Sequence, residues 1–551
     1  MDRRSFLTAR KRQHSQRVPH FGATSGLDPY TGAWTDNEVQ HLLKRTMFGS
    51  TMADLRYFKT KTVVQAVDEL LLPVAALPSP PLNDYSATTP DPDVGAGQVW
   101  TNKPTSDGAI NSQRRSSLKK WWTGVMLNQD RSIREKLTLF WANHFGTEMA
   151  DIGNANYAYT HHALLRQGAL GNFKQLVKAV TIDAGMLRYL NGYLNTNTAP
   201  DENYGRELQE LFTIGKDPFT NLSPYTEDDV KKAAKVLTGW RINNNSFSVF
   251  FDPSKHETSN KTFSAFYNNA VITGRSGAAG ANETDDLLTM IFSKTEVSTF
   301  IVRKLYRWFV YYKIDAATES NVIAPLAAIF RNNNFEIKPV LATLFKSEHF
   351  YDVLNQGCLI KSPVDLVIGC LRETGVQFPD VATSYLDAYS MWNYVYGWIN
   401  TMNQNIGDPP NVSGWPAYYQ APQFHQLWIN ADTLPKRSRF TDTMITSGYT
   451  RNGKKIIIDA VVLAKSLSKP DDPTVLLDEL LVLLYRVSLS ATARQSIKQQ
   501  TLLSNQVSDH YWTDAWNTYV ASPTAANYNI VNSRLKLLLQ YLLDLAEYQL
   551  V

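Results

Sequence analysis

Apolar residues follow the 3.6-residue period of an α-helix through most of this chain of 551 residues. The clearest example is one helix face formed by Ile133, Leu137, Phe140, Trp141 and His144. The same rhythm predicts two helices within 34–72, nearly continuous helix over 116–240, and further helices at 283–313, 319–331, 337–347, 361–375, 381–400 and 531–548. We therefore expect a mainly α structure, built as a large multi-helix globular fold.

Two segments break this rhythm. Residues 78–115 are rich in Pro, Ser, Asp, Asn and Gly, which predicts a loop or linker. Within 242–284, Ser246–Phe251 and Thr262–Phe266 alternate apolar and polar residues, which predicts a small β-hairpin insertion. The expected organisation is therefore N-terminal helices at 34–77, a linker at 78–115, a central helical core at 116–240, the β-hairpin or irregular insertion at 241–284 and a C-terminal helical region at 285–551.

Positive charge is concentrated at the N-terminus. Residues 1–20 carry six basic residues and one acidic residue, so the formal net charge of +4 falls to −1 without them. The neutral body argues against a nucleic-acid-binding protein, which needs a basic face. We interpret 1–20 as a basic arm for targeting or docking. Its Arg3-Arg4-Ser5-Phe6-Leu7 run resembles a twin-arginine export signal, but polar residues follow where such a signal is apolar.

Several common chemistries lack their motifs in this sequence. There is no pair of Glu-x-x-His segments for a ferritin-like di-metal site and no His-Glu-x-x-His zinc motif. A P-loop and a Gly-x-Ser-x-Gly nucleophile motif are also missing. No stretch approaches the roughly 18 apolar residues of a membrane-spanning helix. The sequence therefore identifies no cofactor or metal and predicts no transmembrane segment.

Five stretches, taken together and in order, resemble one bacterial protein family. They are His41–Gly49, Arg134–Phe145, Glu202–Gly215, Tyr225–Trp240 and Pro409–Pro416. They are similar to the bacterial family catalogued as domain of unknown function 1800. The resemblance implies no established catalytic mechanism. It does imply relatives that are often exported and encoded beside another uncharacterised exported family, which favours the periplasm or cell envelope and a protein partner there. The missing apolar signal region leaves a cytoplasmic location open.

The richest cluster of reactive side chains lies at 202–215. On a helical wheel, Asn203, Arg206, Glu207 and Glu210 share a flank about 100° wide beside an apolar stripe. This flank predicts either a preorganised catalytic site or a structural network with Arg206 and Glu210 as i,i+4 partners. His144 occupies a core-facing position, where it needs hydrogen-bond partners. We expect it either to meet this flank as an acid/base group or metal ligand, or to be a satisfied core histidine.

Aromatic residues and amides interleave in the segment 385–428. Aromatic rings cover the C–H faces of sugars, and amides pair with hydroxyl groups. The segment therefore predicts a carbohydrate-binding surface or, alternatively, ordinary core packing. The candidate substrate-binding residues are Trp392, Trp398, Asn411, Trp415 and Trp428.

These patterns leave two functions open. The first is a non-catalytic cell-envelope or assembly protein that binds a protein partner, with the basic arm docking to an acidic surface. The alternative is a carboxylate- or metal-dependent enzyme acting on a polysaccharide or other envelope polymer. In that case the segment 385–428 would hold the substrate, and the catalytic residues would be Glu207, Glu210, His144, Arg206 and Asn203.

Overall fold

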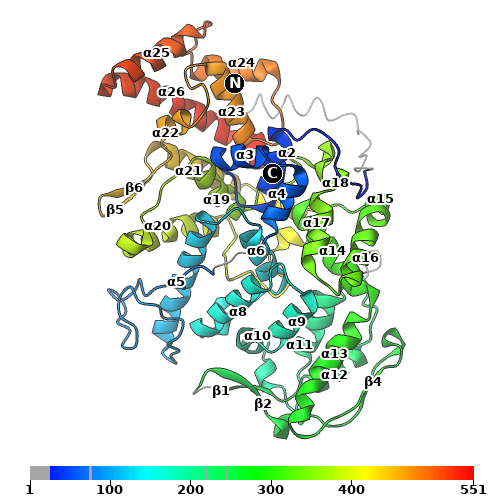
Figure 1. The fold of residues 1–551 in the computed structure, drawn as a ribbon. Coiled ribbons are helices and arrows are strands. Elements are labelled where there is room, and N and C mark those ends of the chain that lie inside the picture. Colours follow the sequence, from blue (N-terminus) through cyan, green and yellow to red (C-terminus); the bar gives the residue numbers. More distant parts are fainter. Residues whose placement is uncertain (1–24, 74–76, 217–220, 244–245) are drawn as a thin grey trace.

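The computed structural model describes residues 25–73, 77–216, 221–243 and 246–551, and it confirms the mainly α fold (Figure 1). The predicted basic arm, 1–20, lies outside the described residues. The first helices are α2 (Asp36–Thr46), α3 (Met52–Lys59) and α4 (Val63–Leu70). Each begins with a capping box built on a threonine, namely Thr35, Thr51 or Thr62. Local hydrogen bonds thus fix where these helices start.

The central region begins with α5 (Gly108–Leu127), whose start lies inside the predicted linker 78–115. The first turns of α5 are polar, so the sequence pattern resembles a loop. The fold buries one of these polar residues, Arg114, which pairs with Asp91 at 2.8 Å, and neither side chain is exposed. A tertiary ion pair therefore supports helix in a stretch without an apolar stripe. The next helices are α6 (Arg134–His144), α7 (Met149–Ile152), α8 (Ala155–Gln167), α9 (Phe173–Thr181) and α10 (Ala184–Tyr189).

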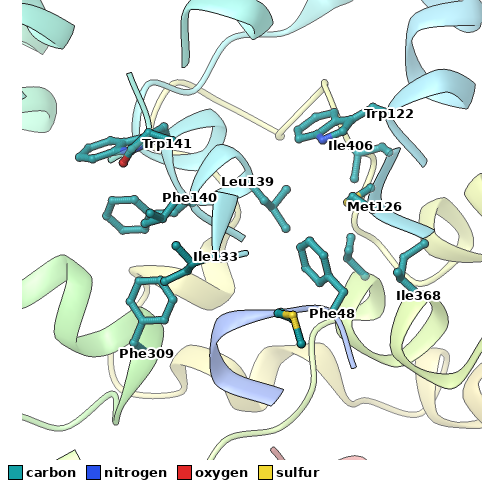
Figure 2. Close-up of a cluster of buried hydrophobic side chains, with 14 of the residues drawn as sticks. Phe48, Trp122, Met126, Ile133, Leu139, Phe140, Trp141, Phe309, Ile368 and Ile406 are labelled. Carbon is teal, nitrogen blue, oxygen red and sulfur yellow. The ribbon is translucent and has the colours of Figure 1, made fainter. Parts of the chain in front are cut away.

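One hydrophobic core joins helices that lie far apart in the sequence (Figure 2). Trp122 and Met126 come from α5, and Phe140 comes from α6. Phe309 is contributed by α14 (Thr295–Phe309) and Ile368 by α19 (Pro363–Glu373). Burial of one such side chain contributes about 1.5–3 kcal/mol. The central and C-terminal helices are therefore held together by shared apolar burial.

The predicted insertion contains two antiparallel hairpins, with β1 (Trp240–Asn243) paired to β2 (Ser248–Phe251) and β3 (Lys261–Thr262) to β4 (Val271–Ile272). The strand expected at Thr262–Phe266 is wrong beyond its first residue, because Ala265–Tyr267 forms a 3₁₀ turn. Ser264 N donates to the Asp229 carboxylate at 2.7 Å instead of to a neighbouring strand. A third hairpin, β5 (Tyr449–Arg451) with β6 (Lys454–Ile456), lies outside the insertion.

The C-terminal half is helical, as its pattern predicts. After α13 (Glu283–Phe292) and α14 come α16 (Ala324–Asn332), α17 (Ile337–Phe345), α19, α20 (Val381–Thr401), α21 (Thr433–Thr446), α22 (Ala460–Lys465), α23 (Pro473–Leu484), α24 (Ala491–Thr501), α25 (His510–Ala521) and α26 (Ala525–Asp544). The last helices, orange to red in Figure 1, gather at the end of the molecule opposite the insertion. None of the helices in the described ranges has the length and apolar character needed to cross a membrane.

Candidate functional site

The segment 202–215 forms α11 (Glu202–Glu207) and then a π-helical turn, Leu208–Thr213. In this wider turn, Ile214 N and Gly215 N both donate to the Gln209 carbonyl at 3.0 Å. Turns of this kind are often found at functional sites. Here the turn presents two backbone carbonyls to other helices. Phe212 O, rather than a side chain of the flank, meets His144, and Leu211 O accepts from Lys304.

The predicted flank residues form separate contacts. Arg206 pairs with both oxygens of Glu227, at 2.7 and 2.8 Å, and with Glu202 at 3.2 Å. Glu210 pairs with Lys216 at 2.5 Å, so the expected Arg206–Glu210 pair is not formed. Asn203 is exposed. Glu207 is half-buried and makes no hydrogen bond or ion pair with any residue that the structure describes.

His144 is buried and satisfied, but by groups other than this flank. Its Nε2 donates to Phe212 O at 3.0 Å, and Lys304 Nζ on α14 donates to its Nδ1 at 3.1 Å. Burial and the neighbouring Lys304 hold the pKa of His144 well below its ordinary value, so the ring is neutral. Lys304 also donates to Leu211 O at 3.1 Å, and burial lowers its pKa to about 7. No sequence pattern points to Lys304, because it belongs to a different helix, α14.

We expect Glu207→Gln to raise the free energy of unfolding at pH 7 by no more than about 0.5–1 kcal/mol. Burial and the Glu210 carboxylate both raise the pKa of Glu207, so the folded state disfavours its charged form. The amide keeps the shape and removes this penalty. Urea unfolding of the variant and of the wild type measures the difference. A decrease of several kcal/mol in the free energy of unfolding would contradict the conclusion that Glu207 has no charged partner in the described structure.

The candidate aromatic residues also separate in space. Trp415 and Trp428 are 2% and 4% exposed. Trp398 packs edge-on against Phe440, with ring centroids 5.7 Å apart. Asn411 is exposed and donates to Tyr419 Oη at 3.3 Å. Of the five candidates, Trp392 alone lines the large cleft described next.

A cleft of about 940 Å³ lies between α5 and α20, bounded by the loop segments 77–82 and 128–132. Four aromatic side chains form its apolar walls: Trp121 from α5, and Tyr385, Tyr389 and Trp392 from α20. The two helices approach closely because α5 has a glycine, Gly124, where an added Cβ would lie 2.4 Å from the Trp392 ring. The walls therefore depend on a contact between residues that are far apart in the sequence.

The other side of the cleft is polar. Glu135 is buried and accepts from Arg166 Nη1 at 2.8 Å, while Arg166 Nη2 donates to its second oxygen. Burial raises the pKa of Glu135 to about 7, although Arg166 acts in the opposite direction. Both amide atoms of Gln129 and Nε of Arg134 are buried without a hydrogen-bond partner in the described structure. Asp130 lies beside them. Large apolar pockets with a few convergent polar groups are the usual form of ligand sites.

Sequence reasoning missed this cleft, apart from Trp392, because five separate segments build it. In the part of the chain that the structure describes, no three His, Cys, Asp or Glu side chains are placed to hold a metal ion. Neither the curated proteins nor the solved structures contain a match to this chain. The profile of the family described as "Protein of unknown function (DUF1800)" matches residues 41–550. Since this match spans nearly the whole sequence, the chain belongs to the DUF1800 family.

Proposed function

We propose that this protein binds a saccharide, such as a segment of an envelope polysaccharide, in the cleft between α5 and α20. The observation that carries the proposal is the combination of aromatic walls with amide, hydroxyl and carboxylate groups in one cleft of about 940 Å³. A sugar has apolar C–H faces that pack on aromatic rings and hydroxyl groups that pair with amides. Tyr385 is only partly buried, so its ring is the most accessible of the four.

The polar residues of the cleft support a hydroxyl-rich ligand. Gln129 offers one acceptor and two donors that have no partner in the described structure. Asn128, Ser79 and Ser132 add further amide and hydroxyl groups. A buried polar group without a partner costs about 1–3 kcal/mol, so hydroxyl groups or water bound here would recover part of this free energy.

At Glu135, the buried carboxyl group of the cleft, the geometry favours binding over cleavage. A proton donor for glycosidic cleavage needs an oxygen free to face the leaving group. Both oxygens of Glu135 are occupied by the Arg166 guanidinium. Glu207 and Glu210, the carboxylates predicted from the sequence, do not line the cleft. A carboxylate-dependent enzyme remains a prediction that these contacts do not favour.

Oligosaccharide titration tests the proposal directly. We expect members of a panel of chito-, cello- and xylo-oligosaccharides to bind the full chain, measured by isothermal titration calorimetry. Tyr385→Ala should weaken binding at least about tenfold, because it removes one stacking surface. Tyr419→Ala is the matched control, since Tyr419 is 40% exposed and lies outside the cleft. Binding by no member of the panel, or equal binding by Tyr385→Ala and wild type, would overturn the proposal.

One observation favours the partner-binding function as a second candidate. On α26, Ile530, Leu537 and Tyr541 are 39–48% exposed and share one helix face, while the opposite face packs on α21, α22, α24 and α25. An apolar helix of an envelope protein is the partner that such a stripe fits. A photo-crosslinker at position 537 should then give one discrete adduct in the native cell, and a crosslinker at exposed Val271 none. Equal crosslinking from positions 537 and 271 would contradict a partner-binding face on α26.

A further inference from the structure

A second, smaller cavity lies away from the cleft, where α2, α6, α14 and the 3₁₀ turn Phe424–Trp428 meet. Its volume is about 40 Å³, enough for one small ion but not for a sugar ring. No residue lines both this cavity and the cleft. Its walls combine aromatic rings with an unusual number of cationic side chains.

The cations of this cavity exceed their carboxylate partners. Lys44 is neutralised by Glu373 and Lys136 by Asp365. Arg45 and Arg307 also line the cavity, and neither has a carboxylate within 4 Å among the described residues. Arg45 is 2% exposed and is fixed by its Nη2, which donates to Asn355 O at 3.0 Å. A buried guanidinium without a counter-charge is unfavourable unless an anion accompanies it.

Three of the lining side chains carry donors that lack a partner in the described structure. They are Nε and Nη1 of Arg45, Nε1 of Trp308 and Nε2 of His425. The tautomer of His425 follows from its other nitrogen, because Nδ1 accepts from Ile360 N at 3.1 Å. Burial and Arg45 lower the pKa of His425 to about 4, so the neutral ring carries its proton on Nε2. The cavity therefore holds four donor atoms without a partner in the described structure. The Asp365 carboxylate on its wall is already paired with Lys136, and Val551 O accepts from Leu359 N.

We propose that this cavity is a binding site for a small tetrahedral oxyanion, phosphate or sulfate, held by Arg45, Trp308 and His425. An oxyanion would accept hydrogen bonds from all three side chains and neutralise the unpaired arginines. The guanidinium of Arg45 offers donors at Nε and at Nη1 that have no partner in the described structure, and each can donate to an oxyanion. This site is independent of the proposed saccharide cleft, because the two share no side chain.

Calorimetric titration of the full chain with inorganic phosphate, and separately with sulfate, tests the proposal. We expect one site per chain. His425→Asn should weaken binding roughly tenfold, since Asn can keep an acceptor near the Nδ1 position for Ile360 N but loses the Nε2 donor. Trp308→Phe should weaken it similarly, because it keeps the ring contact with Tyr418, now 4.2 Å between centroids, and removes the indole N–H. The Tm of the wild type should also be higher in phosphate or sulfate than in chloride at equal ionic strength, because an anion that binds only the folded state stabilises it.

Two comparisons test whether binding belongs to this cavity and to a free ion. Trp516→Phe, on α25 and outside the cavity, should bind phosphate as the wild type does. Glycerol phosphate should bind more weakly than inorganic phosphate, because the cavity has no space for the glycerol group. If glycerol phosphate bound as tightly as inorganic phosphate, the cavity would not be a site for a free phosphate or sulfate ion. Failure of both anions to bind at millimolar concentration, or unchanged binding by both cavity variants with native melting curves, would overturn the proposal.

Discussion

Glu283→Gln is expected to lower the free energy of unfolding by about 3–5 kcal/mol, the range for breaking a fully buried ion pair. Glu283 and Lys261 are both 0% exposed, with Lys261 Nζ 2.6 Å from Glu283 Oε2. The other carboxylate oxygen accepts from Arg275 N at 2.6 Å. Gln keeps the shape but removes the charge, so the Lys261 ammonium remains buried without its counter-charge. Urea unfolding followed by circular dichroism measures the loss.

Two further variants separate charge from shape. Glu283→Gln combined with Lys261→Met removes both charges, and we expect the double variant to be more stable than Glu283→Gln alone. Asp285→Asn is the matched control on the same helix, α13, because its partner Lys178 and Asp285 itself are 46% and 48% exposed. An exposed pair contributes about 0–1 kcal/mol, so this control should change little. The prediction would be contradicted if Glu283→Gln lowered the free energy of unfolding no more than Asp285→Asn does.

Gly414→Ala is expected to destabilise the fold by about 2–5 kcal/mol, combining left-handed backbone strain with overpacking. Gly414 has φ +88°, and a Cβ there would lie 2.5 Å from Asn143 O. Asn143 belongs to α6, and its Oδ1 also accepts from Trp415 N at 2.9 Å, so a shift of Asn143 away from the turn would weaken this hydrogen bond. The turn that inserts Trp415 into the core therefore requires glycine at this position. Thermal and urea unfolding of the variant measure the effect.

Gly397→Ala provides the control for this substitution. Gly397 lies within α20, and an added Cβ would meet no atom within 4 Å. Alanine is favoured over glycine inside a helix by up to about 1 kcal/mol, so this variant should be as stable as the wild type or more stable. If Gly414→Ala behaves like Gly397→Ala, the close approach of the 409–416 loop to α6 is not what stabilises this part of the fold.

The helices were predictable where local signals suffice. The pattern predicts a helix at 381–400, and α20 spans Val381–Thr401, with Asp380 capping its first turn and a kink at Ser384. At 361–375 the observed helix, α19, begins at Pro363 after the Ser362 cap. The predicted start of this helical region, at residue 116, was wrong, because α5 begins at Gly108. Its first turns have no apolar stripe and are supported by the distant carboxylate of Asp91.

The candidate site was harder to predict, for the same reason. The helical pattern predicts that His144 faces the core, but its partners are Lys304, which belongs to another helix, and a carbonyl that the π-helical turn exposes. The pattern around Trp415 predicts either a sugar-binding surface or core packing, and this side chain lies in the core. Aromatic composition cannot separate a binding surface from core packing, since both need the same side chains.

The sequence by itself determined the helical class, the positions of most helices, the location of the insertion and the family. These features depend on residues within a few positions of one another, through helical periodicity and capping. Only the tertiary structure decided which charges are paired, where the cleft opens and which cations remain unpaired. The contacts of Gly124 with Trp392 and of Lys44 with Glu373 join residues hundreds of positions apart. Such contacts depend on how the helices pack, and no local pattern encodes that arrangement.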